Sequence, residues 1–294
     1  LQKDVDGTFP MAKKLVEVAK YYSFDGWFIN QETGGKGASN LKPEQAKLMK
    51  EFLVYLQEIK SNNMEIIWYD SMIDDGRIFW QNRLTEYNKS FLGDENNKLS
   101  DGMFLNFWWT NDRMAVVDPD NVDNYLVHTN TGNELKESGE LAESMNRSKY
   151  DLYAGIDVQA NGYNTKIKWD RLFLEGEKAN TSLGLYCPSW TYDSSSTVEE
   201  FLDKEERFWI NESGDPREES TEDWKGISNN IVEKTPVTEL PFVTNFSMGN
   251  GRSFNVNGEE VSDNEWNHRG MMDVLPTYRW IVDNKKNNLE ASID

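Results

Sequence analysis

The sequence predicts an α/β protein of the (β/α)8, TIM-type barrel class. Short apolar segments recur along the chain, and most are separated by stretches long enough for a crossover helix. Each apolar segment then ends in polar or aromatic residues, as expected where the active site lies at the carboxyl ends of parallel strands. No glycine-rich phosphate turn follows the first segment, which weighs against the competing reading, a doubly wound open sheet.

Two helices are predicted early in the chain. Residues 10–22 repeat apolar side chains at helical spacing, with Pro10 at a position that helix starts favour. The clearest helical pattern covers residues 41–60, with Pro43 near its start and apolar residues three and four apart behind it.

Six strands are expected, at residues 24–29, 64–70, 102–109, 150–159, 183–190 and 241–246. A barrel of this class closes with eight strands, so we expect two strands upstream of the first residue. The catalytic barrel is predicted over residues 1–250. Residues 251–294 follow it and fit the start or edge of a second, β-rich module. The polar stretch 195–235 is harder to place and fits a long excursion between a strand and its helix.

The composition excludes several functions. With a formal net charge of -20, the chain repels phosphate backbones, so nucleic acid is not expected as a partner. One cysteine, Cys187, and two histidines, His128 and His268, leave little for a thiolate metal site or a Ser-His-Asp triad, and we expect no metal and no cofactor. No apolar run is long enough for membrane insertion. Carboxylates, tyrosines and amides remain, and glycoside chemistry needs nothing more.

The end of the first predicted strand carries the most informative residues. Because strand side chains alternate, Asn30 and Glu32 should point to the same side, into the mouth of the barrel. A lone Asn-x-Glu is weak evidence, since strand ends often carry polar caps.

The wider segment, DGWFINQETGG at residues 25–35, resembles the catalytic strand of glycoside hydrolase family 85, the endo-β-N-acetylglucosaminidases. Further strings agree with that family in the same order: IIWYDS at 66–71, FWQNRL at 79–84, FLNFWW at 104–109, GIDVQANG at 155–162, PSWTYD at 188–193, FVTNFSMGNG at 242–251 and VLPTYRW at 274–280. The resemblance runs from about residue 8 to about residue 282.

This resemblance implies hydrolysis of the GlcNAc-β-1,4-GlcNAc core bond of N-linked glycans, with retention of configuration and a capacity for transglycosylation. The substrate's own 2-acetamido oxygen would act as the nucleophile and form an oxazolinium intermediate. Glu32 would then be the general acid/base, Asn30 would orient the acetamido group, and Tyr69 would hydrogen-bond its oxygen.

Flat aromatic side chains near strand ends are candidate platforms for sugar rings, although tryptophan is also often simply packed. The candidates are Trp80, Phe107, Trp108, Trp190 and Tyr192. Asp157 and Asn245 follow predicted strands and could bind sugar hydroxyls, or could be structural.

Two other functions stay open at this point. One is a chitinase-like hydrolase of free GlcNAc polymers, and the other is a carbohydrate-binding barrel without catalysis, although Glu32 is present. The expected partners are N-linked glycans and glycoproteins. By resemblance we expect an extracellular or cell-surface bacterial protein, with the cytoplasm as the alternative.

Overall fold

The computed structural model describes residues 1–33, 41–118, 120–121, 124–173, 179–215, 218, 220–230, 248–272, 279–282 and 285–288. The chain divides into two compact units. The first comprises Leu1–Asp157 and Lys166–Tyr186, and the second comprises Val158–Thr165 and Cys187–Asp294. Each unit is described by itself.

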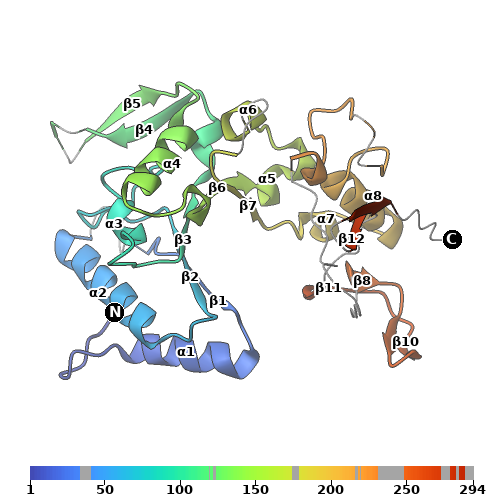
Figure 1. The fold of residues 1–294 in the computed structure, drawn as a ribbon, viewed down its shortest axis with the longest axis horizontal. Helices are drawn as coiled ribbons and strands as arrows, with labels where there is room; N and C mark the ends of the chain where they lie inside the picture. Colours follow the sequence, from blue (N-terminus) through green and yellow to red (C-terminus); the bar gives the residue numbers. More distant parts are fainter. Residues whose placement is uncertain are drawn as a thin grey trace. The chain divides into compact units, whose positions relative to one another are not determined.

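A five-stranded parallel sheet forms the centre of the first unit (Figure 1). Its strands are β1 (Gly26–Ile29), β2 (Glu65–Tyr69), β3 (Gly102–Leu105), β6 (Leu152–Asp157) and β7 (Ser182–Tyr186). They lie side by side in the order β1-β2-β3-β6-β7. Five of the six expected strands are therefore confirmed as parallel neighbours, and the sixth, at 241–246, lies outside the described residues.

The strand order favours the barrel over the doubly wound alternative. A doubly wound sheet reverses its strand order at a switch point, whereas these strands follow one another in one direction. Closure into a barrel of eight strands stays a prediction.

The first unit also contains helices and a hairpin. They are α1 (Pro10–Tyr22), α2 (Pro43–Ile59), α3 (Lys89–Leu92), the 3-10 turn η2 (Phe107–Thr110), the hairpin β4 (Arg113–Val117) and β5 (Tyr125–Thr129), α4 (Glu134–Ser144), η3 (Lys149–Asp151) and α6 (Trp169–Leu172). The two predicted helices are confirmed. Phe9, the residue just before α1, packs edge-to-face against Phe52 of α2, with the ring centroids 5.7 Å apart.

Strand alternation separates the two faces of the sheet. Trp68 of β2 is fully buried and stacks on Phe91 at a centroid distance of 4.7 Å, in the core. Its neighbour Tyr69 packs instead with Phe28 and Phe104 of the adjacent strands. The two faces thus carry different clusters of aromatic rings.

Phe104 is accommodated by two glycines on the following strands. A side-chain carbon at Gly155 of β6 would lie 2.5 Å from the Phe104 ring, and one at Gly184 of β7 would lie 2.4 Å from it. Real Cβ atoms do not approach so closely, so these positions require glycine.

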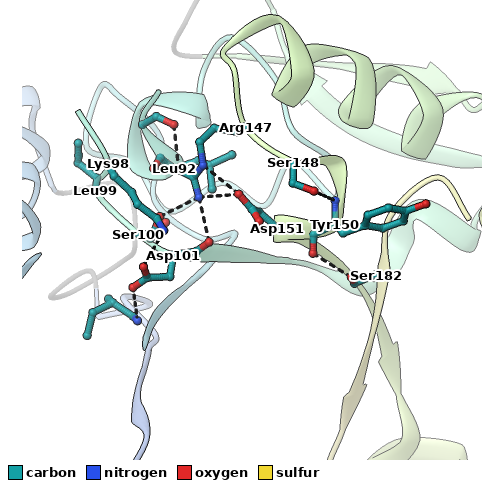
Figure 2. Close-up of polar contacts among 12 residues, drawn as sticks. Leu92, Lys98, Leu99, Ser100, Asp101, Arg147, Ser148, Tyr150, Asp151 and Ser182 are labelled. Carbon is teal, nitrogen blue, oxygen red and sulfur yellow. Dashed lines mark hydrogen bonds and ion pairs between the residues drawn. The ribbon is translucent and has the colours of Figure 1, made fainter. Parts of the chain in front are cut away.

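The amino ends of the strands are joined by a separate polar network (Figure 2). The guanidinium of Arg147 donates to the backbone carbonyls of Leu92, Gly93, Ser100 and Asp101 and to the carboxylate of Asp151, at 2.8–3.1 Å. In barrels of parallel strands, residues at the amino ends of the strands mainly stabilise the fold, whereas the active site is expected at the carboxyl ends.

Asp101 ties the start of β3 to the start of β2 in the same network, since its carboxylate accepts the Ile66 N–H at 2.7 Å. Burial alone would raise the pKa of Asp101. Hydrogen bonds from Lys98, the Ile66 N–H and Gln57 outweigh burial and leave that pKa lowered. The carboxylate is therefore held in its charged form.

The second unit contains mainly short elements. They are α5 (Val158–Asn161), η4 (Gly162–Asn164), α7 (Trp190–Asp193), α8 (Val198–Trp209), η5 (Ile227–Asn230), β8 (Met248–Gly251), β9 (Phe254–Val256), β10 (Glu259–Ser262), β11 (Trp266–Met272), β12 (Arg279–Val282) and β13 (Lys285–Asn288). The last six form antiparallel pairs, β8 with β11, β9 with β10 and β12 with β13. The predicted domain boundary at residue 250 stays a prediction.

Candidate active site

Glu32 lies in the loop that follows β1, and both of its carboxylate oxygens accept a hydrogen bond. The Asn30 amide Nδ2 donates to Oε2 at 2.9 Å, and the Trp80 indole Nε1 donates to Oε1 at 2.9 Å. An indole nitrogen can only donate, so Oε1 must act as an acceptor here. The structure thus brings Asn30, Glu32 and Trp80 together at the carboxyl end of the sheet.

The loop that carries Glu32 is anchored to the next strand. Ser71, just after β2, donates its hydroxyl to the Gln31 carbonyl at 2.9 Å, and the Gln31 side chain bonds the Thr33 carbonyl at 2.8 Å. The strand expected to carry both polar residues ends at Ile29, so Asn30 and Glu32 follow β1 rather than alternate along it. Both are exposed and are joined by their hydrogen bond, whereas Gln31 is half-buried.

Tyr69 ends β2 and is 7% exposed. Its hydroxyl donates to Asn106 Oδ1 at 2.7 Å. Burial raises the pKa of Tyr69 well above its ordinary value, and the negative charges of Glu32 and Asp70 raise it further. The phenol is therefore protonated at neutral pH, and it lies close enough to Glu32 to experience its charge.

Asp70 is completely buried and organises the loop that bears Trp80. Its carboxylate accepts the backbone N–H of Gln81 at 3.2 Å and of Asn82 at 2.5 Å, and the Asn88 amide at 2.9 Å. Burial raises the pKa of Asp70 to about 6, although these donors oppose the shift. The loop 79–88 is thereby held against the ends of β2 and β3.

This shift predicts how Asp70 affects stability. The pKa of Asp70 rises from 3.8 to about 6 on folding, because the folded protein favours the protonated carboxyl. The contribution of Asp70 to the free energy of unfolding is therefore fully present below pH 4 and is lost as the pH rises through 6. The change corresponds to about 3 kcal/mol in the free energy of unfolding. Relative to the wild type, Asp70→Asn should gain about that amount between pH 4 and pH 7, measured by urea unfolding at both values. Parallel pH profiles of the two proteins would contradict this assignment.

Two of the predicted aromatic platforms, Phe107 and Trp108, directly follow the carboxyl end of β3. Trp108 is 46% exposed, and its backbone N–H donates to Asn82 Oδ1 at 3.1 Å. The Phe107 ring lies 6.1 Å from Phe104 and 5.6 Å from Tyr186 at the end of β7. Both belong to η2, so the strand expected to run to residue 109 ends at Leu105, and a tight turn presents these rings instead.

The other predicted site residues are placed differently. Asp157 ends β6, and its charge acts on Tyr69, so it belongs to the same end of the sheet. Trp190 and Tyr192 lie on α7 in the second unit, so their part in the site stays a prediction. The expected strand at 183–190 ends at Tyr186. Asn245 lies outside the described residues.

Within the second unit, Trp190 packs edge-to-face against Tyr163 at a centroid distance of 5.1 Å. The Lys204 ammonium lies 5.4 Å from the Trp190 ring, and Tyr192 is 47% exposed. Glycine is required at position 162, because a Cβ there would lie 2.3 Å from the Trp190 indole. The Trp190 ring is therefore held in a defined position.

Sequence reasoning did not single out Asn82 and Asn106, which connect Trp108 and Tyr69, or Asp70 as an organising group. All three lie inside the strings quoted for the family resemblance, so membership of those strings is the sequence signal that could have identified them.

In the described part of the chain, no cluster of three or more histidine, cysteine or acidic side chains could hold a metal ion. Among the same residues, no helix has the length and apolar character needed to cross a bilayer.

Comparison with known proteins supplies a family relationship. The model of a family described as "Glycosyl hydrolase family 85" matches residues 1–254. Over 285 residues the chain is 27% identical to cytosolic endo-beta-N-acetylglucosaminidase 2 of Arabidopsis thaliana, covering 93% of this chain and 33% of that protein. Over 273 residues it is 24% identical to cytosolic endo-beta-N-acetylglucosaminidase of Homo sapiens, covering 91% and 30%.

A solved structure is also similar. The glycoside hydrolase domain of Endo-D from Streptococcus pneumoniae R6 superimposes with a TM-score of 0.74 at 33% identity, covering 95% of this chain and 41% of that chain. The chain spans roughly a third of the length of the curated relatives that it matches. Those relatives are named as cytosolic, so the extracellular expectation finds no support in them.

Proposed function

The chain belongs to glycosyl hydrolase family 85, and on that premise we propose that its protein hydrolyses the GlcNAc-β-1,4-GlcNAc bond in the core of N-linked glycans. The names of the relatives support this substrate, since they are endo-beta-N-acetylglucosaminidases. The word cytosolic in the names of the curated relatives favours a cytoplasmic location over secretion.

The observation that carries the proposal is the setting of Glu32. Its hydrogen-bond partners in the described structure are an amide and an indole, Asn30 and Trp80, rather than a second carboxylate. Retaining glycosidases of the common type place two carboxyl groups about 5 Å apart, with one as nucleophile. A single carboxylate beside an amide fits the exception in which the substrate supplies the nucleophile.

The proposed reaction uses the 2-acetamido group of the substrate. Its carbonyl oxygen forms a bond to C1 while the bond from C1 to the leaving oxygen breaks, and Glu32 gives its proton to that oxygen. A water molecule then attacks C1, gives its proton to Glu32, and opens the oxazolinium ring with overall retention. If a sugar hydroxyl takes the place of water, the same step is transglycosylation.

Asn30 would orient the acetamido group in this scheme, with Tyr69 beside it. Trp80, which holds Glu32, also offers a flat ring to the sugar, as do Phe107 and Trp108. Asp157 would bind a sugar hydroxyl from the end of β6.

The test of function is a digest of a high-mannose glycopeptide, followed by the mass of the peptide product. A peptide that keeps one GlcNAc supports the proposal. Cleavage of chitin oligomers instead would favour a chitinase-like hydrolase, and binding of the glycopeptide without cleavage would favour a carbohydrate-binding protein.

The mechanism makes a separate prediction for Asn30. Asn30→Ala should lose cleavage of intact glycans by roughly 10²-fold or more, because the acetamido group is no longer oriented for attack. A preformed sugar oxazoline should restore transfer to an acceptor, since the impaired step has been bypassed. Wild-type hydrolysis of intact glycans by the variant would contradict the substrate-assisted scheme.

A further inference from the structure

The exposed ring of Trp108 belongs to a short turn that cannot satisfy its own carbonyl groups. The turn η2 spans only Phe107–Thr110, and the last carbonyls of any helix have no partner within it. The Asn111 N–H donates to the Trp108 carbonyl at 2.9 Å. The carbonyls that follow Trp108 take their donors from segments that are distant in the sequence.

Arg171 of α6 supplies several of those donors. It is 8% exposed, and its Nη1 donates to the Trp109 carbonyl at 2.8 Å and to the Asn111 carbonyl at 2.9 Å. Its Nη2 donates to the Asp112 carboxylate at 3.2 Å. A guanidinium is planar and carries five donors, so this one side chain bonds all three groups at once.

Two carboxylates balance the buried charge of Arg171. The hydrogen bond from Lys168 lowers the pKa of Asp112, and the charge of Arg171 lowers it further. Burial alone would raise the pKa of Glu134, but backbone N–H donors and the charge of Arg171 leave it lowered. Both carboxylates are therefore charged at neutral pH, and they keep the guanidinium in its place.

The same turn is held from two other directions. Asn130, which directly follows β5, donates its Nδ2 to the Asn111 carbonyl at 2.6 Å. On the core side, Trp109 is fully buried and its indole donates to the Gly155 carbonyl at 2.8 Å. The backbone after Trp108 is thus anchored, whereas the Trp108 ring is 46% exposed.

We propose that Arg171 is a positioning residue for substrate binding, which fixes η2 so that the exposed Trp108 ring meets a sugar in one orientation. This inference rests on the proposed function, in which Trp108 offers a flat ring to the substrate. Holding the ring before the substrate arrives lowers the cost of ordering it on binding. Arg171 does not touch the reacting atoms in this role, because its contacts are backbone carbonyls and carboxylates.

Arg171→Met tests the role of the guanidinium. Methionine donates no hydrogen bond, so the carbonyls of Trp109 and Asn111 lose a partner and the turn loosens. The KM for the high-mannose glycopeptide should rise about threefold to tenfold, the range for loss of one aromatic contact. We expect kcat to stay at the wild-type value, as when the lost interaction serves the ground state and the transition state equally.

Arg171→Lys should give an intermediate KM, because an ammonium keeps the charge but cannot reproduce the planar fork. Arg147→Lys is the matched control. Arg147 is also buried and also donates to backbone carbonyls, but at the amino ends of the strands. Both substitutions should lower the unfolding midpoint, and only Arg171→Lys should raise the KM. Each variant is assayed at a temperature at which its circular dichroism shows it to be folded.

A double-mutant cycle shows whether Arg171 acts through Trp108. In the Trp108→Ala background the ring is absent, so adding Arg171→Met should raise the KM no further than Trp108→Ala does alone. If Arg171→Met does not fold, Arg171→Lys takes its place in the cycle.

A second measurement needs no substrate. The protein is labelled with 5-fluorotryptophan, and the fluorine resonance of Trp108 is identified by its loss in Trp108→Phe. That resonance should shift or broaden in Arg171→Met and in Arg171→Lys, and it should stay unchanged in Arg147→Lys. A wild type that cleaves no glycopeptide would refute the proposed function, while the resonance would still show whether Arg171 holds the ring.

Four results would overturn the inference. They are a wild-type KM for a folded Arg171→Met, an equal rise in KM for Arg147→Lys, KM increases that multiply in the double variant, and a Trp108 resonance that is the same in the Arg171 variants as in the wild type.

Discussion

Glu32→Gln is expected to reduce cleavage of a high-mannose glycopeptide by roughly 10²–10⁴-fold, the range for loss of a general acid/base. Glutamine has the shape of glutamate, and its carbonyl oxygen can still accept the Trp80 indole N–H that now bonds Oε1. Asn30 can turn its own amide to suit the new NH₂ group. The substitution therefore removes proton transfer and leaves the packing intact, so kcat should fall while the unfolding midpoint stays unchanged.

Glu58→Gln is the control for this experiment. Glu58 is exposed on α2, so the same chemical change there removes a charge without touching the site. It should cleave the glycopeptide at the wild-type rate. If Glu32→Gln keeps more than about a tenth of the activity, another residue is the general acid, and Glu32 is only a polar residue that follows a strand end.

The sheet was predictable because its strands carry their own boundary signals. In β2, apolar residues run to Tyr69 and then stop at Asp70, and the same pattern marks β1 and β6. Pro10 and Pro43 each open a helix, and both helices begin there. Such signals are local, so a single sequence contains them.

The less regular elements were missed for a physical reason. The strand pattern at 102–109 continued through aromatic residues, yet the backbone turns at Phe107 because Asn82 and Trp108 bond across 26 residues. Helix α8 lies in the stretch 195–235, for which no helix was predicted, although Thr197 caps it by accepting the Glu200 N–H. The Thr-x-x-Glu pattern that often marks a helix start was present there. In the sequence, however, polar residues of the exposed face of α8 surround it.

Contacts between residues close in sequence were easier to predict than contacts between distant residues. Asn30 and Glu32 lie two residues apart, so their sequence spacing kept them close although β1 ends before both, and a hydrogen bond joins them. Asn106 and Tyr69 are 37 residues apart, and Asp70 reaches Asn106 across 36. Which asparagine donates to which group depends on those distances, and no local pattern records them.

The second large effect concerns stability rather than catalysis. Arg147→Met should lower the free energy of unfolding by about 3–5 kcal/mol, as expected when a buried charged group loses its role in a network. The Arg147 side chain is 4% exposed, and all five of its N–H donors are engaged (Figure 2). Four of its acceptors are backbone carbonyls, and three of those belong to the buried residues Leu92, Gly93 and Ser100.

Methionine fills most of the same volume, so the loss comes from the carbonyls left without donors rather than from a cavity. Arg147→Lys should recover only part of it, because an ammonium has three donors and cannot match the planar fork. Lys3→Met is the matched control, since it removes the same charge from an exposed ion pair with Glu51. Surface pairs of that kind contribute little. We expect the unfolding midpoint to fall on the order of 10 °C for Arg147→Met and hardly at all for Lys3→Met. Equal midpoints for the two variants would show that the network at the amino ends of the strands does not hold the sheet together.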